Sequence, residues 1–121
     1  MHWGGQPSRK VLAHVVRSIE KAGLVPIVFF DANVGYILGD RYFDEARMAR
    51  IIDVTADQVC VVSKGMTADE GLLAFARDHG FRVVSNDHYR DWRVRFPFLK
   101  KKGRLLRGIY RDGAVVWRGK L

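Results

Sequence analysis

A regular alternation of amphipathic helical segments with short, continuously apolar runs constrains the fold of this chain more than any other feature. Residues 8–22 repeat apolar side chains every three or four positions, from Val11 to Ile19, and Gly23 follows as a stop signal. The next run, Val25–Phe30, carries Pro26 near its start. Strands that are apolar at every position are buried on both faces, as in a parallel sheet covered by helices. The pattern therefore predicts an α/β domain.

Helical segments and strands continue to alternate along the rest of the chain. The further expected elements are a less regular helix at 40–52, a strand at 58–63, a helix at 67–79, a strand at 81–85, a short turn or helix at 87–92 and a strand at 114–117. The sequence has no internal repeat, and 121 residues is an ordinary length for one domain. We therefore expect a single domain over residues 1–121.

The charge of the chain is unevenly distributed. The formal net charge is +8, and residues 90–121 carry 11 basic against 2 acidic side chains, a net charge of +9. Residues 1–89 carry 10 basic and 11 acidic side chains and are close to neutral. A basic C-terminal segment at 90–121 predicts a polyanionic partner, nucleic acid above all. A merely solubilising basic face is the alternative.

Three other classes of protein do not fit the sequence. The single cysteine, Cys60, lies in an apolar run and allows neither an internal disulfide nor a cysteine-based zinc site. The longest apolar stretch, Leu24–Phe30, is far shorter than the ~20 residues of a membrane span. The first residues show no signal-peptide pattern. We therefore expect a cytoplasmic protein that does not enter a membrane.

Acidic residues follow the predicted strands. Asp31 comes directly after the strand at 25–30, Asp87 and Asp91 follow the strand at 81–85, and Asp69 opens the helix between them. In parallel sheets, ligands bind beyond the carboxyl ends of the strands. Carboxylates that meet there need either protons or a hard divalent cation such as Mg²⁺ or Mn²⁺. We expect a metal site of this kind, which could activate water to attack a phosphodiester.

Each of these acids also has an ordinary structural interpretation. Glu70 stands three residues after Thr67, a spacing typical of a capping box, and we favour that role for it. Asp69 gains from the helix dipole, Asp31 could cap the turn that follows it, and Asp87 could be a turn residue. The metal site is favoured because four acids, Asp31, Asp69, Asp87 and Asp91, stand on elements that we expect to converge.

Residues 61–65, 68–76 and 83–92 resemble the NYN domain of PIN-like nucleases, closest to the branch of Regnase-type endoribonucleases and their bacterial relatives. The most specific part is Ser85–Trp92, which reads Ser-Asn-Asp-His-Tyr-Arg-Asp-Trp. The resemblance implies a three-layer PIN-like fold with a central, mainly parallel sheet flanked by helices. It also implies a bound Mg²⁺ or Mn²⁺ ion, endonucleolytic cleavage of single-stranded RNA and a homodimer.

The resemblance assigns roles to residues by position. It implies that Asp69, Asp87 and Asp91 hold the metal and that Glu70 stands at a position that is often acidic. Asp31 is a further candidate catalytic acid because it lies at the carboxyl edge of the predicted sheet. The resemblance gives Lys64 and Arg90 as phosphate contacts. We also expect Asn86 and Arg93 to contact RNA, with Asn33 and Ser85 as weaker candidates for the site.

The chain departs from the family at its start. The family begins with a strand that ends in an Asp-x-x-Asn-type motif, whose Asp leads the metal site. Here Met1–Gly5 resembles the loop after that motif, and the strand ending at Asp31 matches the second strand of the family. This alignment, which gives the helix at 8–22 a counterpart, implies that the central first strand is missing, that its neighbours keep unpaired edges and that nuclease activity is weak. The competing alignment makes Asp31-Ala32-Asn33 the first-strand motif itself.

Two other functions compete with a nuclease. A non-catalytic RNA-binding module would keep the fold and the basic segment, and the missing first-strand Asp supports it. A Mg²⁺-dependent phosphatase of the haloacid dehalogenase type also places an Asp after an apolar strand. Asn33 stands where such an enzyme has its second Asp, so the phosphatase ranks below the other two.

Overall fold

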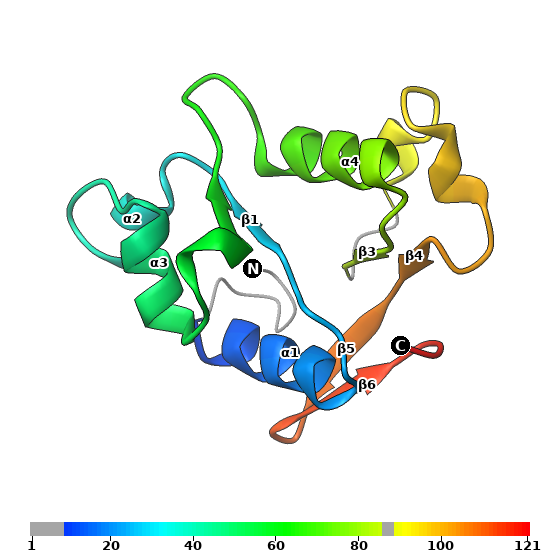
Figure 1. Ribbon diagram of the computed structural model, residues 1–121, viewed down its shortest axis with the longest axis horizontal. Helices are drawn as coiled ribbons and strands as arrows, with labels where there is room; N and C mark the ends of the chain where they lie inside the picture. The colour runs from blue at the N-terminus through cyan, green and yellow to red at the C-terminus, as the bar shows by residue number, and fades with distance from the viewer. Residues whose placement is uncertain (1–8, 86–88) are drawn as a thin grey trace.

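The structure is a computed structural model that describes residues 9–85 and 89–121. Helices and short strands alternate along the chain (Figure 1). The helices and strands are α1 (Arg9–Lys21), β1 (Val28–Phe30), α2 (Val34–Leu38), α3 (Glu45–Ile52), β2 (Val59–Val61), α4 (Ala68–His79), β3 (Val83–Val84), β4 (Leu105–Leu106), β5 (Gly108–Arg111) and β6 (Ala114–Trp117). Three short 3₁₀ helices are η1 (Ala56–Gln58), η2 (Arg90–Trp92) and η3 (Pro97–Lys100).

The predicted helix at 40–52 is wrong in its first third. The helix α3 begins only at Glu45, because Asp44 has an extended backbone and its side chain accepts a hydrogen bond of 2.9 Å from the backbone nitrogen of Arg47. It ends at Asp53, which adopts a left-handed conformation with φ 57°. The helix α2 and the strands β4 and β5 were not expected from the sequence.

The strands form three separate pairs. β1 pairs in parallel with β2, with Val28 opposite Val59, and β3 pairs in parallel with β4, with Val83 opposite Leu105. β5 and β6 form an antiparallel hairpin. The α/β class is thus confirmed, but the expected continuous central sheet is not formed, because within residues 9–85 and 89–121 no strand connects β1 to β3.

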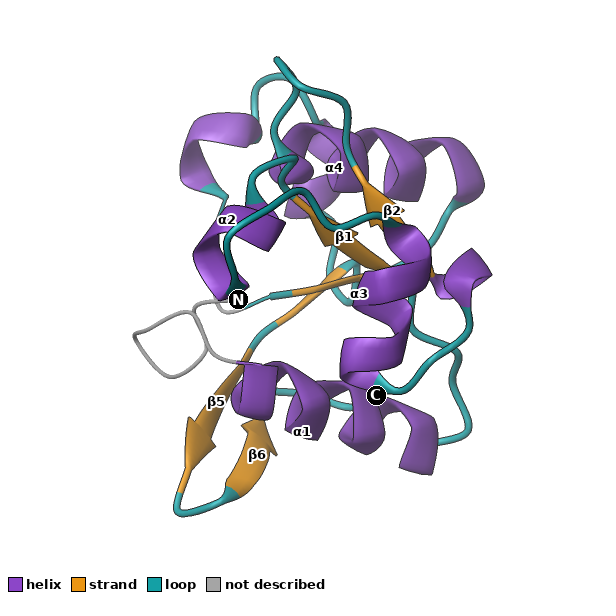
Figure 2. Cartoon of the chain, turned by 90° about the vertical axis from the view of Figure 1, so that its left-hand side faces the viewer, coloured by secondary structure: helices purple, strands orange, loops and turns teal. Residues whose placement is uncertain are grey.

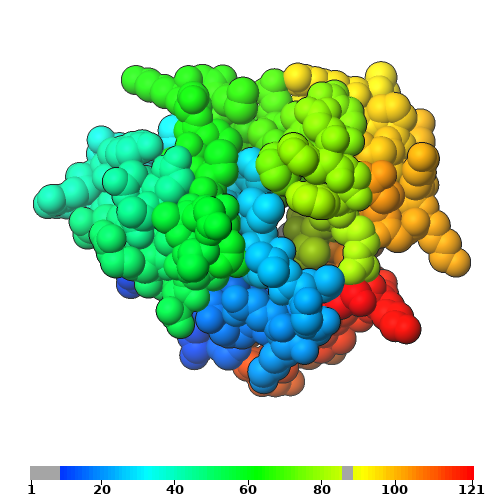
Figure 3. Space-filling model, viewed as in Figure 1, coloured from blue at the N-terminus to red at the C-terminus, as the bar shows by residue number. Residues whose placement is uncertain are grey.

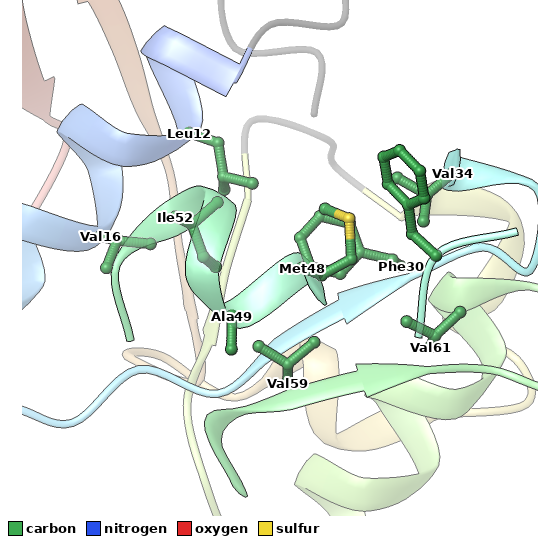
Figure 4. Packing of buried hydrophobic residues seen from close by; sticks show 10 residues of the cluster. Leu12, Val16, Phe30, Val34, Met48, Ala49, Ile52, Val59 and Val61 are labelled. Atoms are coloured by element: carbon green, nitrogen blue, oxygen red, sulfur yellow. The ribbon is translucent and has the colours of Figure 1, made fainter. Parts of the chain in front are cut away.

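Two buried clusters form the core. In the first, Met48 and Ile52 of α3 lie between α1 and the β1–β2 pair, with 0% and 1% of their surface exposed (Figure 4). Burial of such side chains stabilises the fold by ~1.5–3 kcal/mol each. In the second, Leu73 of α4 packs with Val83 and with Phe96, both of them buried.

Helices cover both faces of the strands. α4 lies on one side of β1 and α1 on the other (Figure 2). The hairpin is tied to α1 by Trp117, whose indole nitrogen donates to the Ser18 hydroxyl at 2.8 Å. α1 is tied to the end of α3 by Arg17, which donates to the carbonyl of Ile52 at 2.9 Å. None of the described helices is both long and apolar enough to cross a bilayer.

Candidate functional site

The carboxyl end of β1 is joined to the start of α4 by Asp31. The Asp31 Oδ1 atom accepts a hydrogen bond of 2.7 Å from the backbone nitrogen of Ala68, the first residue of α4. The first amides of a helix have no partner within it, and its N-terminus favours negative charge. Asp31 therefore caps a helix 37 residues away along the chain, and not the turn that follows it.

Asp69 connects the same end of α4 to the segment after β3. The Tyr89 hydroxyl lies 3.5 Å from the Asp69 Oδ1 atom, and both side chains are at least partly buried. Tyr89 is only 4% exposed and adopts a left-handed backbone with φ 53°, a conformation that is rare for a bulky residue. The sequence had singled out its neighbours but not Tyr89 itself. Its place inside the acid-bearing segment was the signal available.

Asp31 and Asp69 line one end of a cavity of about 1000 Å³. Ser85 and Tyr89, from the other strand pair, line the same end, and so does Thr67. The bonds from the Ala68 amide to Asp31 and from the Tyr89 hydroxyl to Asp69 join the end of β1 and the segment after β3 to the N-terminus of α4. We call Asp31, Thr67, Asp69, Ser85 and Tyr89 the polar edge below.

A second hollow, of about 510 Å³, lies beside this edge. Lys64 and Asn33 line it, which brings together two residues that the sequence analysis had named separately. Tyr36 and Tyr42 line it as well, and their exposed fractions are 62% and 53%. Exposed aromatic rings beside a lysine are the usual platform for stacking unpaired bases. Sequence reasoning missed the two tyrosines, although aromatic residues in a polar, glycine-containing stretch were a usable signal.

Glu70 does not form the expected capping box. Its backbone nitrogen donates to the Thr67 hydroxyl at 3.1 Å, as predicted, but its carboxylate binds Arg95 at 2.8 Å and not the Thr67 amide. Arg95 is also held over the rings of Trp92 and Phe96, 5.9 and 5.3 Å from their centroids. The Glu70 carboxylate therefore forms an ion pair that links α4 to the segment between η2 and η3, and it does not cap the N-terminus of α4.

The remaining predicted site residues are spread more widely. Asp91 and Arg90 are exposed on η2 and line neither cavity, and Arg93 is half-buried just beyond them. Asn86 and Asp87 lie outside the described residues. Among residues 9–85 and 89–121, no group of three or more acidic, histidine or cysteine side chains is arranged to hold a metal. In that part of the chain the predicted four-acid cluster is represented by Asp31 and Asp69.

Part of the basic segment supports the fold. Arg104 donates to the carbonyls of Ala76 and Phe81 at 3.3 and 3.2 Å, and its guanidinium lies 4.6 Å from the centre of the Phe98 ring. Arg104 therefore anchors the end of α4. Lys100, Lys101 and Lys102, in contrast, are exposed to solvent.

Cys60 is a structural residue of β2. It is half-buried, and burial raises the pKa of its thiol above the ordinary value of 9.0, with the Glu45 carboxylate as a second cause. A raised pKa keeps the thiol protonated at neutral pH and makes it a poor nucleophile. Cys60 is therefore no candidate for covalent catalysis.

The family models and the curated proteins provide no relative from which a function could be transferred. The likeness to NYN domains thus rests on the motif residues named above, and the fold class rests on the parallel strand pairs and the helices that cover them. No protein-family model matches this chain, and no curated protein matches it either.

Proposed function

We propose that this chain is a PIN-like endoribonuclease that cleaves single-stranded RNA with the help of a carboxylate-bound Mg²⁺ or Mn²⁺ ion. The observation that supports the proposal is the polar edge, where Asp31 and Asp69 come together from β1 and α4 beside Ser85 and Tyr89. These side chains offer only oxygen atoms, and hard divalent cations prefer oxygen ligands. The donors present are thus of the right chemistry for Mg²⁺ or Mn²⁺.

The roles of the residues follow from their positions. A bound ion would lower the pKa of a water molecule and offset the charge that develops on the phosphodiester. Asp69, together with Asp87 as the NYN resemblance implies, would hold the ion, and Asp31 would orient the water. Asp91, which is exposed on η2 and lines neither cavity, has no role in this arrangement. Ser85 would position a phosphate oxygen at the same edge. No protein nucleophile is needed for this reaction.

The second hollow would hold the RNA strand next to the cleavage site. Unpaired bases can stack on Tyr36 and Tyr42, because every base has a π-face, and Lys64 can contact the backbone phosphate. Exposed lysines of the basic segment would add electrostatic attraction along the strand. The hollow lies beside the polar edge, since Ala32 and Asn33 line it directly after Asp31.

The test is metal-dependent cleavage of a labelled single-stranded RNA by Asp69→Asn and Asp87→Asn. Each variant should lose about 100-fold or more of its Mn²⁺-dependent cleavage rate, the size of effect typical for loss of a group that stabilises developing charge. RNA affinity, measured by fluorescence anisotropy, should be unchanged or slightly higher, because each change removes a negative charge.

The matched control is Asp78→Asn, which changes an exposed acid at the opposite end of α4. It should cleave like the original chain. Undiminished cleavage by both Asp69→Asn and Asp87→Asn would show that the site is wrongly placed.

A second function, RNA binding without catalysis, is favoured by two features of the structure. The Asp31 carboxylate is already bound to the Ala68 amide, and no described strand lies between β1 and β3. A binding module would bind the same labelled RNA and form no product at any Mn²⁺ concentration. The cleavage assay therefore separates the two functions.

A further inference from the structure

Glu45 is a half-buried carboxylate in the second hollow, where it lies beside Lys64. It is the first residue of α3, and the N-terminus of a helix favours negative charge. The capping bond of α3, however, is made by the preceding residue, since the Asp44 side chain accepts from the Arg47 nitrogen. Capping of the helix therefore does not occupy the Glu45 carboxylate.

The basic residues close to Glu45 in the sequence are engaged with other groups. Arg41 binds Asp40 at 3.2 Å, and the guanidinium of Arg47 lies 4.1 Å from the centre of the Phe43 ring. Within residues 9–85 and 89–121, the Glu45 carboxylate forms neither a hydrogen bond nor an ion pair. A half-buried carboxylate is incompletely hydrated and gains from any donor that reaches it. Its oxygens are thus available to a bound molecule.

The side chains around Glu45 suit the parts of a nucleotide. Tyr36 and Tyr42 are more than half exposed, and base faces stack on such rings. Asn33 precedes α2, but its side chain makes no capping bond and so leaves its amide for a bound molecule. The segments that line the hollow, residues 32–45 and 61–64, lie on the same side of the molecule (Figure 3, left, cyan to green). A volume of about 510 Å³ is within the usual range of ligand pockets.

The hydrogen-bonding edges of the four bases decide which of them a carboxylate reads. An ionised carboxylate only accepts, and its two oxygens match a pair of adjacent donors. Guanine presents such a pair, N1–H and the N2 amino group, next to its O6 acceptor. Adenine and cytosine present one amino donor beside a ring-nitrogen acceptor, and uracil presents N3–H between two carbonyls. A carboxylate therefore favours guanine over the other three bases.

The charge of Glu45 adds to this preference. A carboxylate repels the phosphates of an RNA strand bound in the same hollow, so it weakens binding unless the neighbouring base offers donors in return. Lys64 and Asn33 line the hollow as well, and either of them can donate to the O6 atom of guanine. The hollow thus combines acceptors for the two donors of guanine with a donor for its acceptor.

We propose that the second hollow is a guanine subsite for single-stranded RNA, in which Glu45 accepts from N1–H and from the N2 amino group of one guanine base. The base stacks on Tyr36 or Tyr42, and Asn33 or Lys64 donates to O6. This inference rests on the proposed binding of single-stranded RNA in the hollow. It adds that the strand is selected for a guanosine beside the polar edge.

The probes are labelled short oligouridines that carry one central guanosine, adenosine, cytidine or uridine. Their affinity for the full chain is measured by fluorescence anisotropy in EDTA, so that the result does not depend on cleavage. The guanosine RNA should bind about tenfold or more tightly than the others, the discrimination typical of a bidentate contact to a base. Inosine, which lacks only the N2 amino group, should lose about fivefold, because one bond to a charged acceptor is removed.

Glu45→Gln keeps the size of the side chain and replaces one of its two acceptors by a donor. This variant should bind guanosine and inosine RNA equally, while its affinity for oligouridine is unchanged or slightly higher. The matched control is Glu20→Gln, which changes an exposed glutamate of α1 that lines neither cavity. Tyr36→Leu should weaken all four RNAs about equally, because stacking does not read the edge of a base. Circular dichroism checks that the variants are folded, and the inosine RNA tests the proposal without any change to the protein.

The outcomes separate this inference from the proposed function. Equal affinity for the four RNAs would overturn the guanine subsite and leave RNA binding standing. A guanosine preference that survives in Glu45→Gln would overturn the assignment to Glu45. Binding of free GMP as tight as that of the guanosine RNA would overturn the RNA subsite and identify a nucleotide site. Failure to bind any RNA would overturn this inference and the proposed function together. A guanosine preference without Mn²⁺-dependent product would support the subsite and overturn only the nuclease.

Discussion

Asp31 is the residue on which fold and proposed chemistry meet. The same carboxylate that stands at the end of β1 satisfies the first amide of α4. Because the Ala68 amide already occupies one lone pair of Oδ1, Asp31 could bind a metal ion only through Oδ2 or the second lone pair of Oδ1. The Asp31 carboxylate therefore helps to set the position of α4 relative to β1. From the sequence alone, the same carboxylate could equally have been assigned to catalysis.

The stability of Asp31 variants tests this structural role. Asp31→Ala should lower the free energy of unfolding by about 1 kcal/mol, because the Ala68 amide loses its acceptor and the helix N-terminus loses a favourable charge. Asp31→Asn, which keeps an oxygen acceptor, should lose less. Urea denaturation of the three proteins measures the difference. A ranking in which Asn is as destabilising as Ala would show that the charge, and not the hydrogen bond, matters.

Tyr89 and Arg95 show why residue roles were only partly predictable. The sequence placed both near the acids, but their partners, Asp69 and Glu70, lie about 20 residues or more away along the chain. The pairing depends on how η2 and the following loop fold back on α4. The local pattern of residues does not encode such long-range pairs.

At the scale of elements, close backbone contact holds α2 against the loop that follows it. A methyl group at Gly35 would overlap the backbone carbonyl of Arg41 and the backbone nitrogen of Phe43. Those atoms belong to the chain itself and cannot move aside as a flexible side chain could. The fold of residues 34–43 thus requires glycine at this position.

Gly35→Ala should therefore destabilise the chain by at least ~1–3 kcal/mol, the range typical of overpacking. The matched control is Gly23→Ala, where a methyl group meets nothing within 4 Å and the only penalty is a left-handed backbone with φ 82°, worth roughly 1 kcal/mol. Thermal or urea unfolding compares the two. Equal losses would mean that the Gly35 contact is relieved by movement of the loop.

The limits of α3 illustrate how far an element can be predicted. The apolar spacing indicated a helix in this region, but not that Asp44 would cap it and leave residues 40–44 outside. The start of a helix depends on which of several Asp, Ser or Thr residues becomes its N-cap, the residue just before the first helical one. Tertiary contacts of α3 with α1 and β2 decide that choice.

At the scale of the whole molecule, the basic segment divides into two parts. Arg95 and Arg104 are engaged in ion pairs, carbonyl contacts and ring packing, and so contribute to the fold. The three consecutive lysines 100–102 are exposed. The net charge alone therefore overstates how much of this segment is available to RNA.

RNA affinity should fall steeply with salt if the exposed lysines contact phosphates. With about four contacts, the logarithm of the binding constant should decrease with a slope of about −3, or ~50-fold between 50 and 200 mM salt. Changing Lys100, Lys101 and Lys102 to Ala should flatten the slope by about 2. Changing exposed Lys10 and Lys21 of α1 to Ala is the control, and its slope should stay the same. Equal slopes in all proteins would place the RNA elsewhere.

The sequence by itself predicted α1, α4, most of α3 and the strands β1, β2, β3 and β6 in their order along the chain. It could do so because periodicity and apolar content are local properties of the chain. It also placed Asp31 and Asp69 at one edge, since parallel strands end on the same side. Only the tertiary structure decided that the strands are split into the pairs β1–β2 and β3–β4 with a cavity lined by residues of β1 and β3, and that Asp31 caps α4. Strand pairing and capping join groups far apart in the sequence, so they depend on how the elements pack in space.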